Sequence, residues 1–211
     1  YYGAFEHLGF PKQADDFPKV SSDLIDRYQD LPSFQSLQLG NKLGLYPVVD
    51  SVAWLEKLLP LGLEIIQLRL KNHSQEALED LIAQAVELCR GSNTRLFIND
   101  YWQLAIKHGA YGVHIGQEDL QDADLRQIQQ AGLRLGISTH GCYEFLLAQQ
   151  LQPSYLAIGA IFATKTKDMT GQIQGLDNLK QILTLAKGIP VVAIGGINLE
   201  RAPQVWQTGV D

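Results

Sequence analysis

Arg95-Leu-Phe-Ile-Asn-Asp100 and Tyr111-Gly-Val-His-Ile-Gly-Gln-Glu-Asp119 are the two stretches that decide the fold of this chain. Each contains a short apolar run, typical of a buried strand, that ends in polar residues. Between them, residues 101–108 have the apolar spacing of a helix. A strand, a helix and a second strand indicate a βα repeat, whose parallel strands have their carboxyl ends at one edge of the sheet.

The same repeat extends in both directions along the chain. The predicted strands are 43–49, 64–68, 95–98, 111–114, 133–137, 154–159 and 190–194. The predicted helices are 51–60, 75–91, 101–108, 121–131, 142–151, 176–187 and 199–208. Ser74 is expected to cap the second of these helices, and Asn198 the last. Catalytic groups that are scattered along the sequence would therefore meet at one edge.

Seven such units precede the last residue, and an open seven-stranded barrel would leave unpaired strand edges. We therefore expect an α/β fold, a (β/α)8 TIM barrel whose eighth βα unit is missing from this sequence, in a chain that continues beyond Asp211. Residues 43–211 would form this barrel domain. Residues 1–42 would form an N-terminal extension with a short helix near Ser22–Tyr28, which either covers the bottom of the barrel or is a mobile tail.

Composition limits the class of protein. The formal net charge of −6 argues against nucleic acid or an anionic membrane as the main partner. No apolar stretch approaches the ~20 residues of a membrane span, and no signal peptide is apparent. Cys89 lies on the apolar side of a predicted helix, far from Cys142, so a reduced and buried thiol is expected. A cytoplasmic protein that binds small molecules is the expectation, with a homo-oligomer left open.

Two acidic residues follow neighbouring predicted strands. Asp100 alone could cap a helix, and Asp119 alone could be a solvated loop residue. Together at one edge of the sheet, two carboxylates without a His or Cys cluster favour Mg²⁺, which prefers oxygen ligands and bridges substrate phosphates. His114, directly after an apolar run, is interpreted as a packed or hydrogen-bonded structural residue.

Cations and hydroxyl groups follow other strands. Thr164-Lys-Thr-Lys167 could surround a diphosphate, although a charged loop is often only solvated. Gly195-Gly196 follows the seventh strand, where barrels often bind phosphate through backbone N–H groups. Arg69 and Lys71 alternate with Gln67 along the exit of the second strand, so the three side chains could point the same way.

These stretches together resemble the thiamine-phosphate synthase family, also called thiamine-phosphate pyrophosphorylase, in its enterobacterial branch. The similar motifs keep their order and spacing from about residue 43 to residue 211. They are Gln67-Leu-Arg-Leu-Lys71, Phe97-Ile-Asn-Asp100, Gly112-Val-His-Ile-Gly-Gln-Glu-Asp119, Gly136-Ile-Ser-Thr-His140, Thr164-Lys-Thr-Lys167 and Ala193-Ile-Gly-Gly-Ile197. The resemblance implies a transferase (EC 2.5.1.3) of thiamine biosynthesis. It would join hydroxymethylpyrimidine diphosphate to thiazole phosphate and release diphosphate by dissociative substitution.

The resemblance also implies a role for each matching residue. Asp100 and Asp119 would hold Mg²⁺, and the N–H of Gly196 would bind the thiazole phosphate. Gln67 and Ser138 would hydrogen-bond the pyrimidine or the leaving group. The groups expected around the phosphate oxygens are Arg69, Lys71, Asn99, Thr164, Thr166 and Lys167. Among all of these, Arg69, Ser138 and Lys167 are expected to be catalytic.

The sequence departs from the family in two places. The apolar eighth strand and its small-residue turn do not appear before Asp211, and residues 168–174 lack the usual Pro. Two alternatives stay open: a thiazole tautomerase-like isomerase on the same barrel, and a non-catalytic barrel that senses thiamine phosphate. The isomerase would need neither the Thr164-to-Lys167 loop nor two metal carboxylates, and the complete set of site residues argues against the sensor.

Overall fold

The structure is a computed structural model, and it describes residues 22–38, 43–164 and 173–211. Seven parallel strands form one sheet, and each is hydrogen-bonded to the next along the chain. The strands are β1 Val48–Val49, β2 Ile65–Leu68, β3 Arg95–Asn99, β4 Gly112–Ile115, β5 Arg134–Thr139, β6 Tyr155–Ile158 and β7 Val191–Ala193. This order confirms the predicted succession of βα units.

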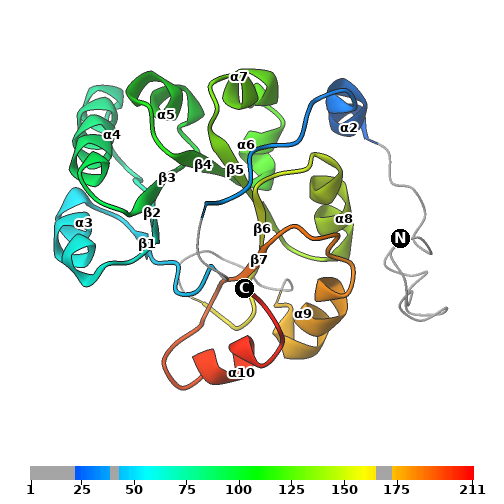
Figure 1. Ribbon diagram of the computed structural model, residues 1–211. Helices are drawn as coiled ribbons and strands as arrows, with labels where there is room; N and C mark the ends of the chain where they lie inside the picture. Colours follow the sequence, from blue (N-terminus) through cyan, green and yellow to red (C-terminus); the bar gives the residue numbers. More distant parts are fainter. Residues whose placement is uncertain (1–21, 39–42, 165–172) are drawn as a thin grey trace.

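The helices lie outside the curled sheet (Figure 1). They are α2 Asp23–Tyr28, α3 Val52–Leu58 with the short 3₁₀ helix η2 Leu59–Leu61, α4 Gln75–Arg90, α5 Trp102–His108, α6 Gln117–Leu120, α7 Leu125–Gln130, α8 Cys142–Gln150, α9 Gly175–Leu183 and α10 Ala202–Trp206. Ser74 caps α4 as predicted, because its side chain accepts a hydrogen bond from the Ala77 N–H.

Four predicted elements differ from the structure, one of them being the helix predicted at 176–187, which ends at Leu183. The first strand is shorter than the predicted 43–49, because only Val48 and Val49 pair with β2. The helix predicted at 121–131 begins only at Leu125, since Asp124 has extended backbone angles and caps α7 from there, and the short helix α6 before it was not predicted. The last helix begins at Ala202, and the side chain of Asn198 instead caps the preceding turn by accepting from the Arg201 N–H.

Side chains alternate between two apolar layers along each strand. Those pointing outward pack against the helices, as Ile98 and Ile137 do. Those pointing into the curl form a smaller cluster that includes Ile65, Phe97 and Tyr155, all fully buried. This alternation is what a curled parallel sheet covered by helices requires. It also directs every second residue near a strand's carboxyl end toward the interior of the curl.

Residues 22–38, which precede β1, pack against the rest of the molecule. The Tyr28 hydroxyl donates to the Ala123 carbonyl at 3.0 Å, and the Ser154 hydroxyl donates to the Gln35 carbonyl at 2.7 Å. The Gln38 N–H donates to the Tyr111 hydroxyl at 3.0 Å. Because Tyr111 and Ser154 directly precede β4 and β6, this segment covers the amino-terminal ends of those strands.

The sheet is a curled, incomplete barrel. Within the described residues β1 and β7 each pair with one strand, so a complete eight-stranded barrel is not shown. Cys89 is buried, Cys142 is partly buried, and both are free thiols, as predicted for Cys89. No helix among the described residues is long and apolar enough to cross a membrane.

Candidate active site

The two predicted metal carboxylates lie close together at the carboxyl edge of the sheet. Asp100 follows β3 and Asp119 lies in α6, just after β4. The pKa of Asp119 is raised above its usual range, first by partial burial of its carboxyl group and then by the negative charge of Asp100. The raised pKa of Asp119 beside the negative charge of Asp100 marks a site that a cation would stabilise.

Both carboxylate oxygens of Asp100 have a partner. Lys71 Nζ lies 2.7 Å from Oδ2, and Asn99 Nδ2 donates to Oδ1 at 3.0 Å. Asp100 adopts a left-handed φ of +65°, and its backbone N–H donates to the His114 carbonyl at 2.9 Å. The alternative that Asp100 only caps α5 is wrong, because the cap residue of that helix is Tyr101 and no side chain bonds there.

No three His, Cys, Asp or Glu side chains within the described parts of the chain gather into a metal-binding group. Asp100 and Asp119 would therefore supply only two protein ligands. This donor set suits Mg²⁺, which keeps several waters and is usually held by one or two carboxylates together with substrate phosphates. It does not suit zinc, which is usually enclosed by four ligands that include His or Cys.

A chain of hydrogen bonds crosses the interior of the curl next to this edge. Gln67 Nε2 donates to the Tyr46 hydroxyl at 3.3 Å, and the hydroxyls of Tyr46 and Tyr155 are 2.8 Å apart. The Tyr155 hydroxyl lies 2.7 Å from His114 Nδ1, and His114 Nε2 lies 2.7 Å from the Ser138 Oγ. Two predicted site residues, Gln67 and Ser138, are thus the two ends of one buried network.

His114 is neutral at physiological pH. Burial lowers its pKa to about 4, against a weaker opposing effect from Asp100. One ring nitrogen therefore donates a hydrogen bond and the other accepts one, which fixes how the Tyr155 and Ser138 hydroxyls are oriented. The prediction that His114 is a hydrogen-bonded structural residue is confirmed by these contacts.

Space for the Tyr155 ring is provided by Gly136 on the neighbouring strand. A Cβ at position 136 would lie 2.2 Å from Cζ of Tyr155. The ring also stacks on His114, with centroids 5.5 Å apart, and meets Phe97 edge to face at 5.3 Å. The backbone of β5 therefore allows a tyrosine to reach the centre of the curl.

The loops after β6 and β7 touch each other through a glycine. Gly196 has a φ of +63°, and a Cβ there would lie 2.5 Å from the Ala163 carbonyl oxygen. The Phe162 N–H donates to the Gly195 carbonyl at 3.0 Å. Thr164 is partly buried in the same loop. The predicted phosphate-binding residues Gly196 and Thr164 therefore come from adjoining loops.

Of the remaining predicted residues, the structure describes Arg69, Lys71 and Asn99. Arg69 is partly buried at the exit of β2, where its N–H donates to the Val49 carbonyl at 2.8 Å. Lys71 is exposed and Asn99 is buried, and both contact Asp100. Thr166 and Lys167 lie outside the described residues.

Sequence reasoning missed four residues of this region. Tyr46 and Tyr155 join the buried network, and Gln117 Nε2 donates to the Ser138 carbonyl at 2.6 Å. Arg201 donates to the Gly196 carbonyl at 2.7 Å, with its guanidinium over the Phe162 ring. Tyr155 begins an apolar run and therefore looks like a core residue. The one available signal was Gly136, which predicts a close approach by a neighbour.

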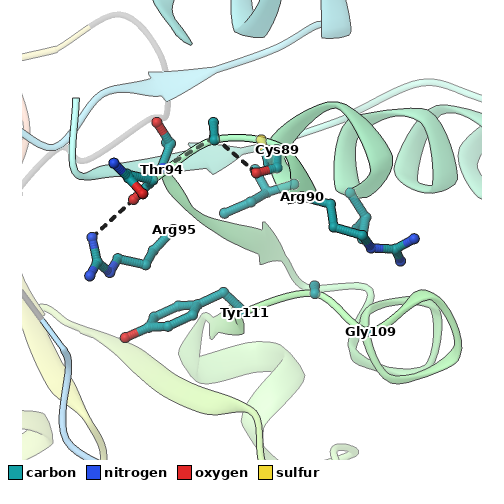
Figure 2. A pocket seen from close by; sticks show the side chains of 11 residues that line it. Cys89, Arg90, Thr94, Arg95, Gly109 and Tyr111 are labelled. Atoms are coloured by element: carbon teal, nitrogen blue, oxygen red, sulfur yellow. Dashed lines mark hydrogen bonds between the residues drawn. The ribbon is translucent and has the colours of Figure 1, made fainter. Parts of the chain in front are cut away.

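A cavity of about 380 Å³ lies elsewhere, at the amino-terminal ends of β3 and β4 (Figure 2). Thr94, Arg95 and Tyr111 line it together with the end of α4. Cys89 also lines it, but burial raises the pKa of that thiol to about 11, so it is not a ready nucleophile. The cavity and the carboxylates are at opposite ends of these strands.

Comparison with known proteins agrees with the site at the carboxyl edge. Residues 45–211 match the family model described as thiamine monophosphate synthase. The chain belongs to the thiamine monophosphate synthase family. The matched residues contain β1 to β7 and every predicted site residue, so family membership covers the whole curled sheet. The chain is accordingly an enzyme of this kind, a transferase of thiamine biosynthesis that forms thiamine phosphate.

Curated relatives and a solved structure support this family assignment. The chain is 55% identical over 179 residues to the thiamine-phosphate synthase of Yersinia pseudotuberculosis, covering 85% of this chain and 82% of the relative. The chain is 54% identical over 181 residues to the thiamine-phosphate synthase of Photorhabdus laumondii, covering 86% of this chain and 84% of the relative. The solved structure of thiamine phosphate pyrophosphorylase from Pyrococcus furiosus is similar, with a TM-score of 0.70 and 32% sequence identity. The match covers 81% of this chain and 83% of that chain.

Proposed function

We propose that this chain joins hydroxymethylpyrimidine diphosphate to thiazole phosphate, giving thiamine phosphate and diphosphate. The observation that carries the proposal is the pair of carboxylates, Asp100 and Asp119, beside the ammonium of Lys71 at the carboxyl edge of the sheet. A substrate that carries a diphosphate with a bound metal has the charges that such a site would bind. The relatives named thiamine-phosphate synthase point to the same chemistry.

Asp100 and Asp119 would hold the Mg²⁺. When bound, the metal would neutralise charge on the diphosphate and so make it a better leaving group. The side chains proposed to complete the diphosphate and phosphate sites are Arg69, Lys71, Asn99, Thr164, Thr166 and Lys167. Lys167 is proposed to stabilise charge that grows on the departing diphosphate, which lowers the barrier rather than only the binding energy.

The buried network would bind the pyrimidine end of the substrate. Gln67 and Ser138 offer polar groups at its two ends, and His114 between them is neutral and therefore adds no positive charge. A carbocation that forms on the pyrimidine methylene would not be opposed by a charged imidazole. Gly196 would leave its backbone N–H accessible to the phosphate of the thiazole.

The proposed reaction changes two bonds. The bond between the pyrimidine methylene carbon and the diphosphate oxygen breaks first, and its electron pair leaves with diphosphate. The thiazole nitrogen then donates its lone pair to the methylene carbon. Neither step requires a protein nucleophile. The residues named above would act through position and charge, with Arg69, Ser138 and Lys167 as the proposed catalytic residues.

A coupling assay tests this proposal. Purified protein is given both substrates, with Mg²⁺ or with a chelator, and thiamine phosphate is quantified. The proposal predicts product only with the metal. Isomerisation of the thiazole without coupling would favour the tautomerase alternative, and binding of thiamine phosphate without turnover would favour the sensor. Neither alternative explains why two carboxylates lie together beside Lys71.

The same proposal extends to the architecture, as a (β/α)8 barrel. Support comes from the free side of β7, where Asp211 N donates to the Val191 carbonyl at 3.0 Å and the Val191 N–H donates to Asp211 Oδ2 at 3.0 Å. Asp211 thus lies beside β7 as a residue of a neighbouring strand would, which supports a barrel in which a further strand pairs with β7. Residues 1–42 are proposed as an extension to a barrel of residues 43 onward.

A further inference from the structure

The ion pair between Lys71 and Asp100 has a consequence for metal binding. Lys71 Nζ lies 2.7 Å from Asp100 Oδ2, and Asn99 Nδ2 occupies Oδ1 at 3.0 Å. Both oxygens of one proposed metal ligand are therefore already bonded to protein donors. A metal at Asp100 Oδ2 would lie close to the ammonium of Lys71, and repulsion between the two cations would favour displacement of Lys71 from that oxygen.

The two partners differ in how easily they move. The side chain of Asp100 is 14% exposed and is held by Asn99 and by the backbone, whereas the side chain of Lys71 is 44% exposed. Lys has a flexible four-carbon stem with three donors on its ammonium, so it can turn to a new anion at small cost. Lys71 is thus the partner that leaves, and Asp100 is the partner that stays.

We propose that Lys71 exchanges between Asp100 in the free enzyme and the diphosphate in the loaded enzyme, so that metal and diphosphate bind cooperatively. The inference rests on the proposed function and adds a binding order to it. Without diphosphate, Lys71 competes with the metal for Asp100. With diphosphate present, the ammonium turns to the new anion and Asp100 becomes available. By linkage, the metal then strengthens diphosphate binding by the same factor.

The test measures metal affinity with the full chain and with simple probes. Mn²⁺, whose free ion is visible by electron paramagnetic resonance, is titrated with and without inorganic diphosphate, and a titration without protein corrects for Mn²⁺ held by diphosphate in solution. Lys71→Met is expected to tighten Mn²⁺ binding roughly two- to tenfold without diphosphate, the range of a partly exposed ion pair. With diphosphate present, Lys71→Met should bind Mn²⁺ no more tightly than the wild type does.

A control variant distinguishes the exchange of Lys71 from a general effect of removing one positive charge. Lys107→Met removes an equal charge from a lysine that pairs with Glu79 on the outer helices, and it should leave Mn²⁺ affinity within about twofold. If Lys71 only repelled the metal from a distance, Lys71→Met would tighten binding equally with and without diphosphate. That equal tightening, or no tightening without diphosphate, would overturn the exchange.

Failure of the metal site itself would look different. Asp100→Asn should weaken Mn²⁺ binding under both conditions. If Asp100→Asn binds Mn²⁺ as well as the wild type, the carboxylate pair is not the metal site, and both the proposed function and the exchange are lost. If Asp100→Asn weakens binding while Lys71→Met does not tighten it, the metal site stands and only the exchange is overturned.

Discussion

At the scale of single residues, the interior of the curl depends on one glycine. Gly136→Ala should lower the free energy of unfolding by about 1–3 kcal/mol, because the added Cβ would lie 2.2 Å from the Tyr155 ring. The matched control is Gly91→Ala, where no atom lies within 4 Å and the φ of −83° suits alanine. Urea unfolding of both variants measures the difference, and equal stability would show that the ring moves aside freely.

His114 gives a second prediction at the same scale. Its pKa is lowered to about 4 in the folded protein and lies near 6.5 when the chain is unfolded. Between these values the unfolded chain binds the extra proton, so stability should fall by about 3 kcal/mol as the pH drops from 6.5 to 4. His114→Gln should lose stability less steeply over this range in urea unfolding. Parallel slopes would assign the loss to other groups.

At the scale of elements, the two serine caps offer a matched pair. Ser74→Ala should lower the free energy of unfolding by roughly 0.5–2 kcal/mol, because the Ser74 side chain accepts from the Ala77 N–H at the start of α4. Ser51 precedes α3 without a side-chain bond, so Ser51→Ala should change stability by a smaller amount. Thermal unfolding compares the two, and a larger loss for Ser51→Ala would contradict the capping argument.

Elements were largely predictable because their apolar spacing is local. Every predicted strand from β2 to β7 appears within two residues of its expected bounds, since each is a short buried run with polar ends. The late start of α7 was not predictable from spacing, because it depends on whether Asp124 lies inside the helix or caps it. The four-residue helix α6 is too short to show a helical spacing of apolar residues. The same local competition moved the start of α10 to Ala202.

At the scale of the whole molecule, the predicted carboxylates meet because parallel strands end at one edge. The sequence therefore indicated that Asp100 and Asp119 lie together. It did not indicate that Lys71 forms an ion pair with Asp100, or that Tyr46 and Tyr155 belong to the hydrogen-bond network between Gln67 and Ser138. Those contacts depend on register and on the packing of aromatic rings inside the curl, which no single segment encodes.

The central claim is that Asp100 and Asp119 hold the metal for thiamine phosphate formation. The most direct measurement is the rate of product formation against Mg²⁺ concentration for the wild type, Asp100→Asn, Asp119→Asn and the control Asp122→Asn, an exposed acid nearby. At limiting Mg²⁺ we expect the rate to fall on the order of 100-fold in Asp100→Asn and in Asp119→Asn, and the control Asp122→Asn to match the wild type. Near-normal rates in both Asp100→Asn and Asp119→Asn at limiting Mg²⁺ would contradict the account.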